Sequence, residues 1–134
     1  MRRKRILVVD DEVYVAHILE FSLGMEGYEV VTATSGDEAL AKADEEHPDL
    51  IVLDILMPKM DGYEVCRRLK ADERFADVPV ILLTAKHGAE DRQKGLEVGA
   101  NAYITKPFRP MDLIDQIRSL LEALPSAGEE AIGM

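Results

Sequence analysis

Short apolar runs alternate with longer amphipathic stretches along most of the chain. The runs are rich in β-branched residues, which favour strands, and each is nearly continuous, which is typical of strands covered on both faces. They read ILVV, YEVVTA, LIVL, VPVILLT and AYIT, at residues 6–9, 28–33, 50–53, 78–84 and 102–105. This pattern predicts five buried strands.

Helical spacing fills the stretches between the runs. After the first run, apolar residues recur at this spacing at Val13, Ile18, Phe21 and Met25. Further helices are predicted near residues 36–46, 63–71, 89–98 and 110–123. Two of them begin with capping-box sequences, Ser35-Gly-Asp-Glu38 and Asp61-Gly-Tyr-Glu64. The order predicts an α/β protein with a flavodoxin-like, doubly wound (βα)5 fold and a five-stranded parallel sheet of order 2-1-3-4-5.

The composition is that of one globular domain, with 134 residues, of which 47% are hydrophobic and 31% charged. We expect the domain to span residues 1–124 and a frayed tail to span 125–134, where periodicity is lost. No apolar run approaches the ~20 residues of a membrane span, and none near the N-terminus suits a signal peptide. We therefore expect a cytoplasmic protein without a membrane partner. The single cysteine, Cys66, excludes an internal disulfide.

A carboxylate interrupts the third apolar run, which leads directly into Asp54. Burying a carboxylate is costly, so stability does not account for it. In a doubly wound fold, ligands bind outside the carboxyl ends of the strands, and polar residues stand at several of these ends. They are Asp10 and Asp11 after the first run, Thr84 at the end of the fourth, and Lys106 after the fifth. The expected strand order brings them to one crevice.

This set of residues suits phosphoryl transfer. Clustered carboxylates repel one another by about 3 kcal/mol for a pair roughly 5 Å apart in an effective dielectric near 20, so a cation is expected among them. Hard oxygen ligands and room for a phosphoryl group favour Mg²⁺. Asp54 would be the nucleophile that forms an aspartyl phosphate, while the metal and Lys106 neutralise charge and Thr84 donates a hydrogen bond.

Each residue also has a plainer structural interpretation. A single aspartate at a strand end is commonly a solvated turn or a helix cap, and an Asp-Asp pair could cap the following helix. Lys-Pro is frequent in loops, and Thr84 could be an ordinary strand-end hydroxyl. The functional interpretation is favoured because all of these residues occur together at the corresponding strand ends.

The chain resembles the receiver domain of two-component response regulators over about residues 4–123. The motifs that carry the resemblance are ILVVDDE, DLIVLDILMPKMDGYE, PVILLTA and GANAYITKPF, in that order and spacing. The resemblance implies Mg²⁺-dependent phosphorylation by a histidine kinase or phosphotransfer protein, and a signalling switch rather than an enzyme with conventional turnover.

The resemblance also implies a role for each acidic residue. Asp54 matches the phosphorylated aspartate, and it would be a metal ligand as well. Asp10 and Asp11 match the acidic pair that holds Mg²⁺. Leu56, two residues beyond the acceptor, would offer its backbone carbonyl to the metal.

Four further positions match the family pattern. Thr84 and Lys106 match the hydroxyl and the lysine that contact the phosphoryl group, and Tyr103 matches an aromatic residue that reorients when the hydroxyl moves. Pro107 matches a proline usually preceded by a cis peptide bond, which would direct Lys106 into the site.

The lifetime of the phosphorylated form depends on residues that flank the approach of water. By the same resemblance these are Leu56 and Lys86. Neither offers a carboxylate or an amide to orient a water molecule. We therefore expect slow self-dephosphorylation.

We expect the signal to pass to a separate downstream effector protein, because these 134 residues hold no effector domain, unless the sequence is an excised part of a longer protein. The net charge of −10 repels phosphate backbones, so no direct nucleic-acid partner is expected. DNA-binding response regulators often read Asp-Asp-Tyr where this chain has Asn101-Ala102-Tyr103, and their fifth helix carries a pairing arginine where this chain has Gln116. A monomer or weak dimer is therefore expected.

Three rival functions are open to test. An aspartate-nucleophile phosphohydrolase would carry a second aspartate at the position of Leu56, and a flavin-binding module would need a Ser/Thr/Gly-rich loop in place of DDE. The main alternative is a degenerate receiver that acts as a phosphorylation-independent interaction module. The complete set of acceptor, acidic pair, hydroxyl and lysine argues against it.

Overall fold

A computed structural model describes residues 3–85 and 89–123, in which five strands alternate with five helices, as the sequence predicted. The strands are β1 (Arg5–Val9), β2 (Glu29–Ala33), β3 (Leu50–Asp54), β4 (Val80–Thr84) and β5 (Ala102–Thr105). The helices are α1 (Val13–Met25), α2 (Gly36–Glu46), α3 (Gly62–Ala71), α4 (Ala89–Glu97) and α5 (Pro110–Ala123). The expected tail at 125–134 and Lys86 lie outside the described residues.

The strands form one parallel sheet in the order β2-β1-β3-β4-β5, which confirms the predicted topology. Every residue of β3 and β4 is buried. Successive side chains point to opposite faces, so Ile51 and Leu53 join one core cluster while Leu50 and Val52 join the other. Two buried faces explain why the apolar runs are continuous.

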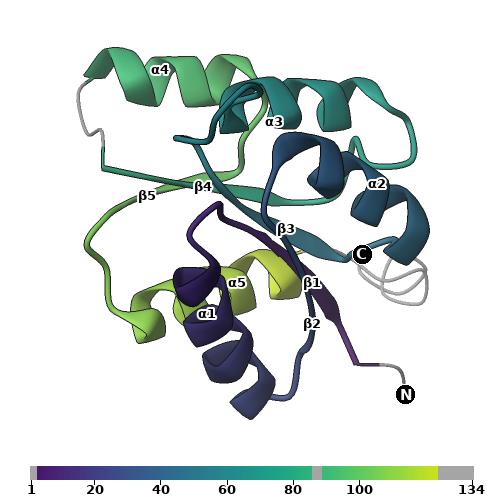
Figure 1. The fold of residues 1–134 in the computed structure, drawn as a ribbon, viewed down its shortest axis with the longest axis vertical. Helices are drawn as coiled ribbons and strands as arrows, with labels where there is room; N and C mark the ends of the chain where they lie inside the picture. The colour runs from purple at the N-terminus through teal and green to yellow at the C-terminus, as the bar shows by residue number, and fades with distance from the viewer. Residues whose placement is uncertain (1–2, 86–88, 124–134) are drawn as a thin grey trace, which may run out of the picture.

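Helices cover both faces of this sheet, with α2, α3 and α4 on one side and α1 and α5 on the other (Figure 1). The core under the first group includes Tyr63 and Cys66 of α3. The core under the second group includes Leu19 of α1 and Leu113 of α5. Polar residues stand at the carboxyl ends of the strands, with Asp54 and Thr84 as the last residues of β3 and β4 and Asp10 directly after β1.

The buried face of helix α1 could not be identified from the apolar spacing alone. The helix is confirmed, but it is anchored through Ala16, Leu19 and Leu23. The four apolar residues that indicated the helix lie on its outer side and are 46% to 72% exposed; they are Val13, Ile18, Phe21 and Met25. Helical spacing identified the element, whereas the packing partner decided which stripe is buried.

The first predicted capping box forms with one change of partner. The Ser35 hydroxyl accepts a hydrogen bond from the Glu38 backbone N–H at 3.1 Å, as expected for an N-cap. The Glu38 carboxylate reaches back to the N–H of Thr34 at 2.7 Å, one residue before the cap. Both bonds satisfy amide donors at the start of the helix.

The second predicted capping box forms only in part. The Asp61 carboxylate accepts a hydrogen bond from the Glu64 N–H at 3.0 Å and so begins α3. The Glu64 carboxylate pairs with Arg67 at 2.5 Å and Arg68 at 2.7 Å, one turn further along the same helix face. These two guanidinium groups compete successfully for the carboxylate that would have completed the box.

Candidate functional site

The sheet register places two carboxylates side by side. Strands β1 and β3 pair Val9 with Leu53, and the next residue on each strand is an aspartate. These residues, Asp10 and Asp54, are 0% and 4% exposed. Asp10 does not cap α1, because its carboxylate accepts a hydrogen bond from the N–H of Glu12 at 2.9 Å, just before the first helical residue. The interpretation of Asp10 as a simple helix cap is therefore wrong.

Lys106 brings a positive charge to the two buried aspartates. Its Nζ lies 3.2 Å from an oxygen of Asp10 and 3.6 Å from an oxygen of Asp54. The Lys106 backbone N–H donates to the carbonyl of Thr84 at 2.7 Å, and the Lys106–Pro107 peptide bond is cis. Burial lowers the pKa of the Lys106 ammonium, but the attraction of Asp54 and Asp10 outweighs this effect and raises the pKa overall.

Asp54 is held in an environment that disfavours its charge. Burial is the main cause that raises the pKa of Asp54 to about 6, and repulsion by Asp10 adds to it. The attraction of Lys106 and a hydrogen bond from the Leu56 backbone N–H, at 3.4 Å, act in the opposite direction. One lysine therefore does not compensate for two buried carboxylates, and the site has a deficit of positive charge.

Asp11 and Leu56 form the outer rim of the site. The carboxylate of Asp11 is exposed, and Leu56 is 50% exposed. Together with Glu12, Asp54 and Lys106 they line a pocket of about 320 Å³. Solvent or a small group can therefore reach the Asp54 carboxylate through this pocket.

Thr84 and Tyr103 lie on the neighbouring strands. Thr84 is the last residue of β4, next to β3, and it is fully buried. Tyr103 pairs with Leu82 in the register and packs beneath α4 on the face of the sheet that holds α3. Thus the structure brings the predicted acidic residues, Lys106 and Thr84 to one edge of the sheet, whereas Tyr103 lies further back along β5.

A glycine that sequence reasoning did not single out closes the back of the site. The Gly62 N–H donates to the carbonyl of Ile55 at 2.9 Å. A Cβ on Gly62 would lie 2.4 Å from the backbone oxygen of Asp54, far inside van der Waals contact. The helix α3 can therefore approach β3 this closely only with glycine here. A glycine after the Asp61 N-cap was the available signal.

The three aspartates meet the requirements of a divalent metal site. One carboxylate oxygen from each of Asp10, Asp11 and Asp54 can be chosen so that all three lie within 4.8 Å of one another. Carboxylate oxygens are hard ligands, which suit Mg²⁺ or Ca²⁺, and a bound cation would remove the charge deficit around Asp54. The acidic triad is of the kind typical of Mg²⁺-binding receiver sites.

Comparisons with known proteins agree with this geometry. A family model described as "Response regulator receiver domain" matches residues 6–118. "Probable transcriptional regulator ycf27" of Cyanophora paradoxa is 53% identical over 121 residues, which cover 90% of this chain and 49% of that protein. "DNA-binding dual master transcriptional regulator RpaA" of Synechocystis is 40% identical over 130 residues, which cover 95% of this chain and 54% of that protein.

The solved structures point to the same fold. The chemotaxis protein CheY4 of Vibrio cholerae has a TM-score of 0.85 at 34% identity, and the match covers 89% of this chain and 99% of that chain. By contrast, this chain spans about half the length of the curated relatives described above. In the part of the chain that the structure describes, no helix is long and apolar enough to cross a membrane.

The relatives overturn the expected partners. We expected a separate effector protein and no nucleic-acid partner, but the similar proteins are transcriptional regulators about twice as long as this chain, and one is named as DNA-binding. The matched region is only the receiver part of such proteins, so the acidic charge of this part does not describe the whole molecule. The expectation that this receiver signals to a separate partner is wrong for the same reason.

Proposed function

The chain belongs to the response regulator receiver family, whose members are phosphorylation-dependent signalling switches, and we propose that Asp54 is its phosphoryl acceptor. The donor would be a phosphohistidine on a histidine kinase or a phosphotransfer protein. The single observation that carries the proposal is the position of Asp54, a nearly buried carboxylate at the rim of β3 beside Asp10 and Lys106.

In the proposed reaction, a carboxylate oxygen of Asp54 attacks the phosphorus atom. A new O–P bond forms while the P–N bond of the phosphohistidine breaks, and the imidazole leaves after taking up a proton. Lys106 already contacts the carboxylate and is positioned to neutralise charge on the transferred group. Thr84, buried at the end of β4, would donate a hydrogen bond to a phosphoryl oxygen.

We propose Mg²⁺ as the cofactor, held by Asp10, Asp11, Asp54 and the backbone carbonyl of Leu56. When bound, it would supply charge neutralisation for the phosphoryl oxygens. Burial, and then repulsion by Asp10, raise the pKa of Asp54, and this supports the assignment because a bound cation would favour the ionised carboxylate. A ligated Asp54 would be ionised at neutral pH and therefore competent as a nucleophile.

The output is proposed from the relatives. We propose that phosphorylation of this receiver controls a DNA-binding function in the whole protein, as the names of the transcriptional relatives suggest. We place the reaction in the cytoplasm, where histidine kinases draw on ATP. We also propose that the receiver domain spans residues 1–124.

The test uses a small phosphodonor such as phosphoramidate and follows the mass of the intact protein. Wild type should gain one phosphoryl group with Mg²⁺ and none with EDTA, and Asp54→Asn should gain none because an amide is too poor a nucleophile. Glu20→Gln, which removes an exposed carboxylate on α1, serves as the control and should behave as wild type. A degenerate receiver would leave wild type unmodified under both conditions, and an unchanged mass gain in Asp54→Asn would disprove the acceptor assignment.

A further inference from the structure

Tyr63 links three parts of the molecule through one side chain. It is the second residue of α3 and is only 4% exposed. Its hydroxyl donates a hydrogen bond to the backbone carbonyl of Asp91 in α4, at 3.2 Å. Burial, and after it the neighbouring hydroxyl of Tyr103 on β5, raise the pKa of Tyr63, so the two phenol groups lie next to each other. The tyrosine therefore connects α3, α4 and β5 at a single buried point.

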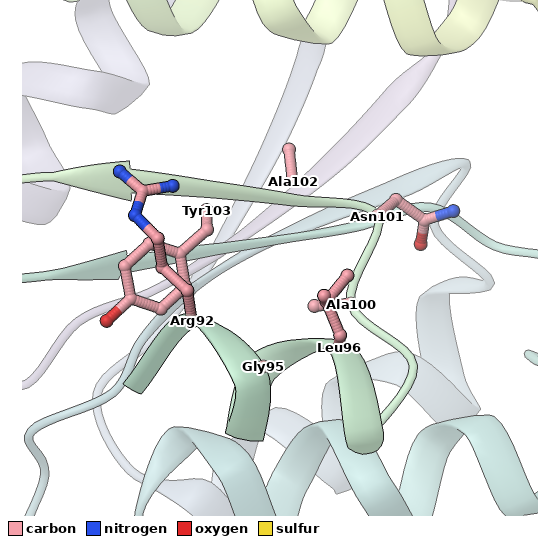
Figure 2. A pocket seen from close by; sticks show the side chains of 7 residues that line it. All are labelled: Arg92, Gly95, Leu96, Ala100, Asn101, Ala102 and Tyr103. Carbon is pink, nitrogen blue, oxygen red and sulfur yellow. The ribbon is translucent and has the colours of Figure 1, made fainter. Parts of the chain in front are cut away.

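Two cationic side chains of α4 lie over the rings of Tyr63 and Tyr103. The Nζ of Lys94 lies 4.6 Å from the centre of the Tyr63 ring, and the guanidinium carbon of Arg92 lies 5.1 Å from the centre of the Tyr103 ring. Figure 2 shows Arg92 lying over the Tyr103 ring beside Gly95. Each tyrosine is thus covered by a cation of α4, an attractive arrangement with an aromatic face.

A small residue allows α4 to approach Tyr103. A Cβ on Gly95 would lie 3.2 Å from a ring carbon of Tyr103, which is tighter than most real contacts. Gly95 stands four residues after Asp91, so both lie on the same face of α4. Tyr103 also lines a pocket of about 280 Å³ between α4 and β5 (Figure 2).

The backbone next to Tyr63 packs against the end of β3. The preceding residue, Gly62, contacts the backbone of Asp54 so closely that no Cβ fits there, and its N–H is bonded to Ile55. A shift of the backbone at Asp54 therefore moves the first turn of α3 with it. Because packed interiors transmit small displacements, the shift reaches the hydroxyl of Tyr63.

We propose that Tyr63 is a positioning residue that couples the backbone beneath Asp54 to α4 and to the orientation of the Tyr103 ring. Its hydroxyl holds α4 through Asp91 and holds the Tyr103 ring in one of its available positions. Loss of this hydroxyl removes the bond to Asp91 and the polar contact with Tyr103, and leaves the ring to sample the neighbouring pocket. The coupling to phosphorylation rests on the proposed function of Asp54, whereas the hold on Tyr103 does not.

The first experiment tests the hold on Tyr103 in the unphosphorylated protein. Tyrosines are labelled with fluorine, and the signal of Tyr103 is assigned from Tyr103→Phe. In Tyr63→Phe we expect the minor orientation of Tyr103 to rise about fivefold relative to wild type, as loss of a neutral hydrogen bond allows. Tyr28→Phe is the matched control, since Tyr28 packs on the opposite face of the sheet and should leave the Tyr103 signal unchanged.

The second experiment tests the coupling, by measuring the rate of phosphorylation with phosphoramidate and Mg²⁺ in a double-mutant cycle. Tyr63→Phe and Tyr103→Phe should change the rate by similar factors, and the double variant should change it no more than either alone. Thermal unfolding of each variant confirms that it is folded.

Two results would overturn the proposal: a Tyr103 signal that Tyr63→Phe does not alter, or rate factors that multiply in the double variant. A wild type that is never phosphorylated would instead refute the function proposed for Asp54. In that event the fluorine signal still decides whether Tyr63 holds Tyr103.

Discussion

Replacing Asp54, the proposed acceptor, should make the metal-depleted protein more stable. Asp54→Asn removes a nearly buried negative charge but keeps the shape of the side chain, and the amide oxygen can still accept the Leu56 N–H. The pKa of Asp54 rises from its ordinary value of 3.8 to about 6 in the folded chain. A difference of about 2 in pKa corresponds to a cost of roughly 3 kcal/mol for keeping the carboxylate ionised in the native state.

The pH dependence follows from the direction of this shift. A carboxyl group with a higher pKa in the folded than in the unfolded state takes up protons on folding. Its contribution favours the native state below pH 4 and is lost as the pH rises through about 6. The advantage of Asp54→Asn over wild type should therefore be absent near pH 3.8 and reach its full size of about 2–3 kcal/mol above pH 7.

Urea unfolding in EDTA at several pH values measures this difference. With a slope of about 1–3 kcal/mol per molar urea, the midpoint of the variant should exceed that of wild type by roughly 1–2 M at pH 7.5. Glu20→Gln changes the net charge by the same amount at an exposed position and should move the midpoint little. An Asp54→Asn variant no more stable than wild type at pH 7.5, or a gain that is the same at pH 4, would refute the reasoning.

Three further predictions concern the metal, the close backbone contact and the lifetime of the signal. Mg²⁺ should raise the thermal unfolding temperature of wild type but have little effect on Asp11→Asn, and an equal rise in both would contradict the ligand assignment. Gly62→Ala should lower the free energy of unfolding by about 2 kcal/mol or more in urea unfolding, because its Cβ would collide with the Asp54 carbonyl. Gly24→Ala, which has open space in α1, should be neutral or stabilising, and equal effects at both glycines would refute the contact. Leu56→Asn, alone or with Lys86→Glu, should shorten the life of the aspartyl phosphate, since an amide can orient water, and an unchanged decay of phosphoprotein would argue against the role of Leu56.

Much of the candidate site could be inferred from local sequence because its residues stand at strand ends. The position of Asp54 after a continuous apolar run, and of Asp10 after another, implied one edge of a parallel sheet. The register of β1 and β3 then places these two residues together. Tyr63 gave no such signal, since an aromatic residue early in an amphipathic helix is ordinarily read as core packing, and its hydroxyl contacts depend on α4 and β5.

The sequence by itself determined the elements, their order and the chemical groups available at the strand ends. These follow from short-range physics, since β-branched runs, helical spacing and caps such as Ser35 act over a few residues. Only the tertiary structure decided which stripe of α1 is exposed, how far the pKa of Asp54 is raised, and that Gly62 contacts the backbone of Asp54. Each of these depends on burial and on charges or atoms brought from distant positions, and a local pattern carries no information about such neighbours.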